Sequence, residues 1–255
     1  MKTSKSKKTI LRVVAPVMVA AMALAPVFNT VSAFAIGRDG YKAILDYSTL
    51  DDAKTAAAKL DEEIGGEGAI LLKNDGTLPI PTGARVTLFG SAVTSLKGGQ
   101  SSVTPTVTLP QALANGGYDV NSLIVTESTA KNVNNADIQL YSQAAIVVLS
   151  RGGSEGSDLS VNSGEDAKET ENIGGWTHEQ LTLQSGKEKK HGQMLSDAEI
   201  ALIAKAKETC KSVIVLLNTS NPMELYNLEQ DARINAIMFL GRIGANSIKA
   251  VPNLL

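Results

Sequence analysis

The chain has 255 residues, 43% of them hydrophobic, with 4% aromatic residues and a formal net charge of −2. This composition offers neither the basic surface nor the aromatic stacking platforms of nucleic-acid-binding proteins, so nucleic acid is excluded as a partner. Cys210 is the only cysteine and has no partner for an intrachain disulfide, so stability must come from an apolar core.

Residues 1–33 predict a secretory signal peptide. Five basic residues precede an apolar run, and Val31-Ser32-Ala33 is a small-x-small cleavage site. The run from Val13 to Phe28 holds about 16 residues with two prolines, which is short for a membrane span of roughly 20 residues. We therefore expect a secreted, extracellular protein without a stable membrane anchor after cleavage. Its mature chain would carry a net charge of about −7.

Residues 34–67 are expected to form a helical lead-in to the following domain. Between residues 50 and 63, four apolar side chains recur at helical spacing: Leu50, Ala53, Ala57 and Leu60. Asp51 and Asp52 lie at the favourable N-terminal end of this helix. Gly65 and Gly66 are predicted to end it, and its apolar side is predicted to pack on another element.

From residue 68 onward, predicted strands and helices alternate. Residues 68–80 predict a short apolar strand, a turn at 74–76 and a return strand. Further strands are expected at 85–90, 118–120, 123–125, 144–149, 212–217 and 234–240, and helices at 108–115 and 136–143, from Ser196, from Pro222 and from Ala245. Alternation of this kind predicts an α/β fold, a mostly parallel sheet with helices on both faces.

The helix that begins after Ser196 has the clearest start signal. Ser196 and Glu199 have the spacing of a capping box, in which each side chain bonds the backbone of the other residue. We expect Ile200, Ile203 and Ala204 to form the inner face of this helix.

Residues 144–158 (AAIVVLSRGGSEGSD) are the first place to look for chemistry. An apolar run suited to a strand buried on both faces breaks into glycines that flank Glu155. Ligands of open α/β sheets bind at the carboxyl ends of the strands, where this turn would lie. The alternative for Glu155 is a solvated carboxylate in a flexible loop.

The polar stretch from residue 157 to residue 193 is longer than most loops inside compact domains. Its Trp176, the only tryptophan, fits either a platform for stacking a sugar or an anchor that pins the loop. His178 and His191 show no metal-ligand spacing, so we expect no metal site.

Seven segments resemble, in their order, the α/β-sandwich domain of glycoside hydrolase family 3, the β-glucosidase-like enzymes. They are GAILLKNDGTLPIP, RVTLFGS, KGGQSS, AAIVVLSRGGSEGSDL, MLSDAEIALI, SVIVLLNTSNPMEL and INAIMFLGRIGANS. The resemblance covers residues 68–255, and it rests on order and spacing rather than on any one segment.

The resemblance implies roles for residues around the glycine-rich turn. Glu155 would be the general acid/base, while Arg151 and Asp158, which flank it, would bind substrate. Trp176, as a stacking platform, is a further candidate for binding substrate. Such a donor must stay protonated near its working pH, so its surroundings must raise its pKa. The family chemistry implies a carbohydrate substrate and no cofactor.

The sequence also departs from the family pattern. A retaining glycosidase needs a second carboxylate as nucleophile, and in this family it belongs to a (β/α)8 barrel that the chain does not supply. The family's later Asn-Pro-Ser-Gly-Arg-Leu-type segment is also absent. The order of signal peptide and sandwich resembles the permuted subgroup, with the chain truncated before the barrel. We therefore expect residues 68–255 to be a sandwich domain incomplete at its C-terminus, inactive alone, from a secreted β-glycosidase that removes terminal sugars from oligosaccharides or β-glucosides.

Two other functions fit parts of the sequence. Residues 152–156 match G-x-S-x-G, so Ser154 would be the nucleophile of a serine esterase, although the residues that follow lack helical spacing. The non-enzymatic alternative is a secreted carbohydrate-binding or pseudo-enzyme module that kept the sandwich and lost the barrel.

Overall fold

The computed structural model describes residues 47–96, 104–151, 172–173, 176–177 and 193–255. The chain divides into two compact units, Met1–Ala56 and Ala57–Leu255. The predicted signal peptide lies outside the described residues. Helix α2 (Leu50–Glu67) contains the boundary between the units, and the sheet belongs to the second unit.

A six-stranded sheet forms the centre of the second unit, in the order β1-β8-β7-β4-β2-β3. The strands are β1 (Ile70–Asn74), β2 (Arg85–Phe89), β3 (Asp119–Val125), β4 (Ala144–Ser150), β7 (Ser212–Asn218) and β8 (Ala236–Phe239). All neighbouring strands are parallel except β1 and β8, which are antiparallel. A separate antiparallel pair joins β5 (Asn172–Ile173) and β6 (Trp176–Thr177).

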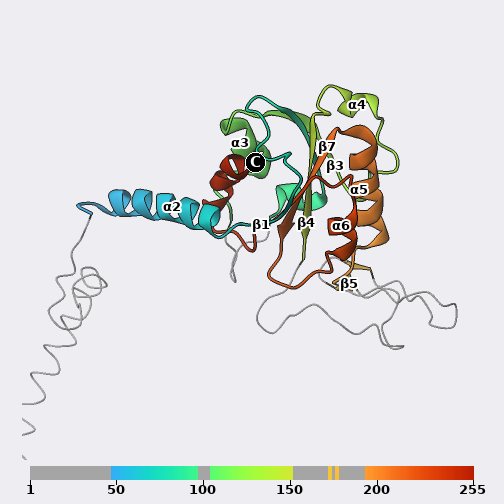
Figure 1. The fold of residues 1–255 in the computed structure, drawn as a ribbon. Helices are drawn as coiled ribbons and strands as arrows, with labels where there is room; N and C mark the ends of the chain where they lie inside the picture. Colours follow the sequence, from blue (N-terminus) through green and yellow to red (C-terminus); the bar gives the residue numbers. More distant parts are fainter. Residues whose placement is uncertain (1–46, 97–103, 152–171, 174–175, 178–192) are drawn as a thin grey trace, which may run out of the picture. The chain divides into compact units, whose positions relative to one another are not determined.

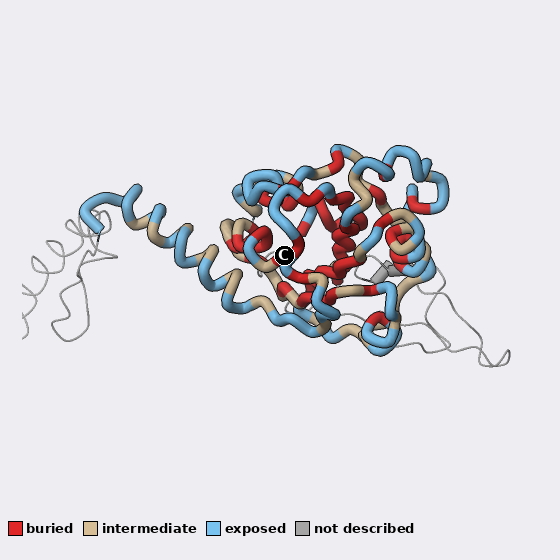
Figure 2. The backbone as a smooth tube through the Cα atoms, turned by 45° about the horizontal axis from the view of Figure 1, so that its top comes forward, coloured by how far each residue is buried: buried red, intermediate tan, exposed pale blue. Residues whose placement is uncertain are grey.

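Strand β4 lies between β2 and β7, and residues 144–149 are all buried. Its side chains alternate between two cores, with Ile146 and Val148 on one face and Val147 and Leu149 on the other. The continuous apolar run that predicted this strand therefore reflects burial on both faces. Figure 2 shows the buried backbone of the central strands as a red band inside the unit.

Helices cover both faces of the sheet (Figure 1). One core contains residues of α3 (Leu109–Asn115), of the 3-10 helix η2 (Ser91–Thr94) and of the C-terminal segments η4 (Ser247–Ala250) and α7 (Val251–Leu254). The other contains residues of α4 (Ala136–Gln139), α5 (Asp197–Thr209) and α6 (Tyr226–Gln230). The predicted fold class, an α/β sandwich with a mostly parallel sheet, is confirmed.

Two strand predictions need correction. The return strand after the turn at 74–76 does not form: the Asn74 side chain accepts hydrogen bonds from the Gly76 and Leu78 N–H groups, and β1 pairs with β8 instead. Conversely, the two weak strands at 118–120 and 123–125 are one strand, β3, because its ladder with β2 continues past an irregularity near Leu88.

Several helix boundaries also differ from expectation. Pro222 does not open a helix, since α6 begins only at Tyr226, and α4 ends at Gln139 rather than residue 143. The C-terminal helix begins as the 3-10 segment η4. Helix α2 continues through Gly65 and Gly66 to Glu67, and none of its residues is buried.

The glycine side of α2, rather than its predicted apolar side, meets the C-terminal segment. A Cβ atom built on Gly65 would lie 2.5 Å from the Cβ atom of Ser247. Asp61 accepts hydrogen bonds from the Asn246 N–H group at 2.6 Å and the Ser247 hydroxyl at 2.5 Å. At position 65 only a residue without a side chain permits this close approach, so Gly65 is tolerated inside the helix.

Candidate functional site

The carboxyl ends of the parallel strands form the candidate site. Ser150 and Asn218 are paired residues at the ends of β4 and β7. The Ser150 hydroxyl donates to the Asn218 carbonyl oxygen at 3.0 Å, and the Asn218 amide donates to the Gly241 carbonyl oxygen at 2.8 Å. These bonds tie the ends of three neighbouring strands, β4, β7 and β8, into one rigid edge.

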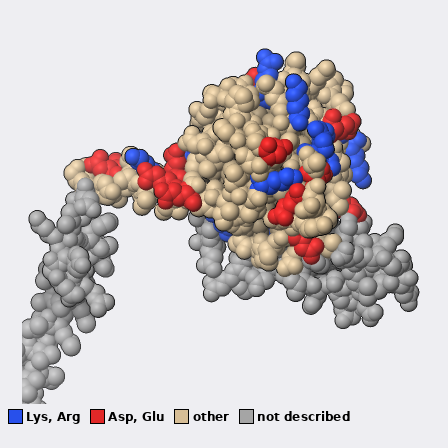
Figure 3. Space-filling view, viewed as in Figure 1, with Lys and Arg blue, Asp and Glu red and all other residues tan. Residues whose placement is uncertain are grey.

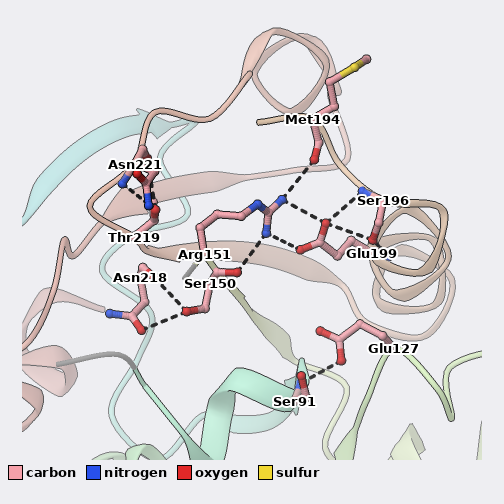
Figure 4. A network of polar contacts seen from close by, with 10 residues as sticks. All are labelled: Ser91, Glu127, Ser150, Arg151, Met194, Ser196, Glu199, Asn218, Thr219 and Asn221. Carbon is pink, nitrogen blue, oxygen red and sulfur yellow. Dashed lines mark hydrogen bonds and ion pairs between the residues drawn. The ribbon is translucent and has the colours of Figure 1, made fainter. Parts of the chain in front are cut away.

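Arg151 follows β4 directly, and its side chain is fully buried. Its guanidinium donates two bonds to the Glu199 carboxylate, Nη1 to Oε1 at 2.6 Å and Nη2 to Oε2 at 3.1 Å. It also donates to the carbonyl oxygens of Ser150 at 3.0 Å and Met194 at 3.2 Å. Figure 4 shows the guanidinium between the Glu199 carboxylate and the Met194 carbonyl group.

Glu199 receives its place from the start of α5. The capping box predicted after Ser196 is present: the Ser196 hydroxyl accepts from the Glu199 N–H group at 3.2 Å, and Glu199 Oε2 accepts from the Ser196 N–H group at 3.0 Å. The box turns the Glu199 carboxylate inward, where Arg151 meets it. With the residue only 7% exposed, the carboxylate satisfies the helix start and the buried cation together.

The inner face of α5 therefore differs from the predicted one. Its buried residues are Glu199, Leu202, Ile203 and Ala206. Ile203 was expected there, but Ile200 is 47% exposed and Ala204 is also exposed. The prediction was wrong at these two positions because it placed only apolar side chains inside, whereas a paired carboxylate occupies the first inward position.

Burial shifts the pKa of both members of the pair. It lowers the pKa of Arg151 to about 10, against the opposing effect of the Glu199 charge. It raises the pKa of Glu199, against the effects of Arg151 and the Ser196 backbone N–H group. The two charge-assisted bonds between the side chains favour the ionised form of each group, against this effect of burial.

A second acidic residue lies at the same edge of the sheet. Glu127, two residues after β3, accepts a hydrogen bond at 3.0 Å from the Ser91 N–H group, just after β2. Its charge also favours the protonated form of Arg151. Sequence reasoning missed both Glu127 and Glu199 as members of the edge; a carboxylate directly after a predicted strand end could have indicated Glu127.

The structure tests the predicted site residues only in part. Glu155, Asp158 and Ser154 lie outside the described residues, as do His178 and His191. The backbone of Trp176 belongs to β6, and its role stays a prediction. Arg151 lies at the edge as expected, but with protein partners, and its predicted contact with substrate stays a prediction.

The part of the chain that the structure describes offers neither a reactive cysteine nor a metal site. Burial raises the pKa of the Cys210 thiol to about 11, so it stays protonated and is a poor nucleophile at neutral pH. Within the same residues, His, Cys, Asp and Glu side chains form no group of three or more that could hold a metal ion. Nor does any described helix have the length and apolar character needed to cross a membrane.

Charged side chains of both signs are mixed on the surface. Figure 3 shows lysine and arginine side chains interspersed with acidic ones, with no continuous basic surface among the described residues on this face. Acidic side chains gather on the C-terminal half of α2, at Asp61, Glu62, Glu63 and Glu67. This face offers no basic stripe of the kind that binds a nucleic-acid backbone.

Comparison with protein families gives one match. The family model described as "Glycosyl hydrolase family 3 C-terminal domain" matches residues 69–255. No curated protein sequence matches the chain.

Solved structures with a similar fold include β-glucosidases. β-Glucosidase 3B from Thermotoga neapolitana, in complex with glycerol, has a TM-score of 0.54 at 18% identity, covering 85% of this chain and 30% of that chain. A β-glucosidase from Listeria innocua, in complex with isofagomine, has a TM-score of 0.53 at 19% identity, covering 85% of this chain and 28% of that chain. A glycoside hydrolase family 3 β-glucosidase from the fungus Neurospora crassa has a TM-score of 0.52 at 21% identity, covering 78% of this chain and 24% of that chain. The chain spans less than a third of the length of each.

Proposed function

Because the chain belongs to glycosyl hydrolase family 3, matching its C-terminal domain, we propose that it is the acid/base-bearing domain of a secreted retaining β-glycosidase of the β-glucosidase type. Glu155 is its general acid/base. The substrate is a β-glucoside or an oligosaccharide from which a terminal sugar is removed. A (β/α)8 barrel domain supplies the nucleophile.

The observation that carries the proposal is the position of β4 in the sheet. This central strand ends at Ser150, and Arg151 anchors the chain at the edge where α/β folds bind ligands. Glu155 follows Arg151 by four residues, so the length of the chain between them limits their separation to about 14 Å. That distance permits Glu155 to reach a sugar bound at the edge.

The proposed chemistry needs two carboxyl groups. Glu155 donates a proton to the leaving glycosidic oxygen while the barrel nucleophile forms the glycosyl-enzyme, and Glu155 then takes a proton from the water that hydrolyses it. The two carboxyl groups must come within about 5–5.5 Å of each other, so the carboxyl edge of the sheet would face the barrel. Glu199 does not serve as either of these carboxyl groups, since its carboxylate is paired with the Arg151 guanidinium inside the fold.

The test is replacement of Glu155 by Ala in the barrel-containing gene product. The variant should form the glycosyl-enzyme from an activated aryl β-glucoside and then accumulate it. Azide, a small nucleophile that needs no general base, should restore turnover and yield a glycosyl azide.

Glu165→Ala and Glu171→Ala are the matched controls, because both residues belong to the same polar stretch. They should keep turnover and give no azide product. If Glu155→Ala kept near-normal turnover, or if only a control variant responded to azide, Glu155 would not be the acid/base.

A further inference from the structure

Arg151 and its partners connect two parts of the chain that lie far apart in sequence. Arg151 directly precedes the stretch 152–193, whereas Met194, Ser196 and Glu199 directly follow it. The guanidinium donates hydrogen bonds to two groups that follow the stretch, the Met194 carbonyl oxygen at 3.2 Å and the Glu199 carboxylate at 2.6 Å. We name Arg151, Met194, Ser196 and Glu199 the Arg151 clasp.

The clasp is attached to rigid structure on both sides. On the Arg151 side, the Ser150 hydroxyl bonds the Asn218 carbonyl oxygen at the end of β7. On the other side, the capping box fixes the Glu199 carboxylate to the first turn of α5, whose Leu202 and Ala206 are fully buried. The two ends of the stretch that carries Glu155 are therefore held at fixed positions.

A buried ion pair needs a reason beyond stability. Removing both charges from water is costly, and apolar side chains of similar size usually hold a fold as well as a buried pair does. An apolar pair, however, lacks directional bonds and could not bind a backbone carbonyl group and a carboxylate at one point. The planar guanidinium provides this geometry through donors in a fixed arrangement.

We propose that the Arg151 clasp is a positioning device: it fixes both ends of the stretch 152–193 at the carboxyl edge of the sheet and thereby sets where Glu155 meets the substrate. Arg151 is thus a positioning residue rather than one that touches the sugar. The consequence for catalysis rests on the proposed role of Glu155. The closure of the stretch rests only on the described contacts.

Hydrogen–deuterium exchange on this chain tests the closure directly. The double variant Arg151→Met/Glu199→Gln removes both charges, while glutamine keeps the capping-box acceptor. Exchange in peptides that cover residues 152–196 should rise by about tenfold or more, while peptides from β7 and β8 stay unchanged. The matched control is Lys207→Met/Asp231→Asn, which removes another ion pair of α5 with the same N···O distance of 2.6 Å.

The control variant should leave exchange at 152–196 unchanged. Equal exchange in the wild type and the double variant would overturn the clasp, and so would an equal rise in the control. If the double variant does not fold, Arg151→Lys decides, because lysine keeps the charge but cannot bond both carboxylate oxygens and the Met194 carbonyl oxygen at once. Exchange at 152–196 should then rise without loss of circular dichroism, and unchanged exchange would overturn the clasp.

Activity of the barrel-containing gene product tests the catalytic consequence. With Arg151→Lys, kcat should fall by about tenfold or more for a β-glucoside with a poor leaving group, and by less than about twofold for an activated aryl β-glucoside, whose departure needs little proton donation. An equal fall for both would show a general loss of structure and overturn the positioning role. If exchange rises in the clasp variants but Glu155→Ala keeps its turnover, the proposed function fails while the clasp stands.

Discussion

At the scale of single residues, Arg151 has the most demanding environment in the described part of the chain. Its side chain is the largest of the fully buried side chains by residue volume, and the others of large volume are leucine, isoleucine and phenylalanine. The sequence placed Arg151 at the strand end but could not show its partner, because Glu199 lies 48 residues later and its spacing to Ser196 already had an explanation as a helix cap. Local patterns predict contacts within a turn or two, whereas this contact depends on the packing of α5 against the sheet.

The first prediction concerns this pair. Arg151→Met leaves the Glu199 carboxylate buried without its cation, so the free energy of unfolding should fall by about 3–5 kcal/mol. Adding Glu199→Gln should recover most of that loss, because no unpaired charge remains. Urea denaturation measures both values; additive losses in the double variant would show that the two side chains do not act as a pair.

The second prediction concerns a more exposed ion pair. Lys207 Nζ lies 2.6 Å from Asp231 Oδ2, and the hydrogen bond from Lys207 holds the pKa of Asp231 below its ordinary value of 3.8. The unfolded chain therefore takes up a proton first as the pH falls. The contribution of this ion pair to stability is fully present above the pKa that Asp231 has in the unfolded chain. It is lost as the pH falls through the lower pKa that Asp231 has in the folded protein.

Asp231→Asn should accordingly lower the free energy of unfolding at pH 7 by about 1 kcal/mol or less, because both side chains are partly exposed. The difference from wild type should shrink steadily as the pH falls below 3.8. Urea denaturation across pH measures this trend, and a difference that stayed constant down to acid pH would contradict it.

At the scale of secondary structure, the sequence predicted best where one local signal decides the outcome. The capping box predicted at Ser196 starts α5, and the apolar runs at β4 and β7 both form central strands. The predictions failed where a distant contact decides. Asn74 closes the turn after β1, but the strand partner comes from β8, more than 150 residues later.

The third prediction compares two neighbouring glycines in α2. Gly→Ala within a helix normally stabilises by about 0.5–1 kcal/mol. At Gly66 a Cβ atom would lie 3.5 Å from the Ala250 Cβ atom, an ordinary contact, so Gly66→Ala should stabilise. At Gly65 it would lie 2.5 Å from the Ser247 Cβ atom and 2.8 Å from its Cα atom, so Gly65→Ala should destabilise by about 1–3 kcal/mol.

Thermal denaturation followed by circular dichroism separates the two glycine variants by the sign of the change in Tm. A rise for both would mean that α2 does not pack closely on η4. A fall for both would mean that the helix C-terminus needs glycine for its backbone and not for its contacts.

At the scale of the whole molecule, the order of segments indicated both the family and the fold, and both are confirmed. The active site could not be derived in the same way. Its proposed acid/base and its proposed nucleophile belong to different domains, and no pattern within residues 69–255 specifies how those domains meet.

The fourth prediction follows from this division. The isolated chain 34–255 supplies one of the two carboxylates that double displacement needs, so it should not hydrolyse an aryl β-glucoside. The measurement is release of the aryl group, with Glu155→Ala as the background control. Turnover above that background would mean that the chain carries a complete active site.

The pairing of β1 with β8 also determines when β1 can join the sheet during synthesis of the chain. Ile70 and Phe239, which lie opposite each other in the sheet, are 169 residues apart in the chain. At about 5–20 residues per second, a ribosome needs roughly 10–30 s to synthesise the interval between them. During that time β1 has no sheet partner, and its Ile70, Leu71 and Leu72, still half-exposed in the finished fold, face the cytosol or a translocation channel without cover. The contact between β1 and β8 closes a long loop and therefore forms late in folding. A chaperone that binds the nascent chain would accordingly meet it with β1 still unpaired.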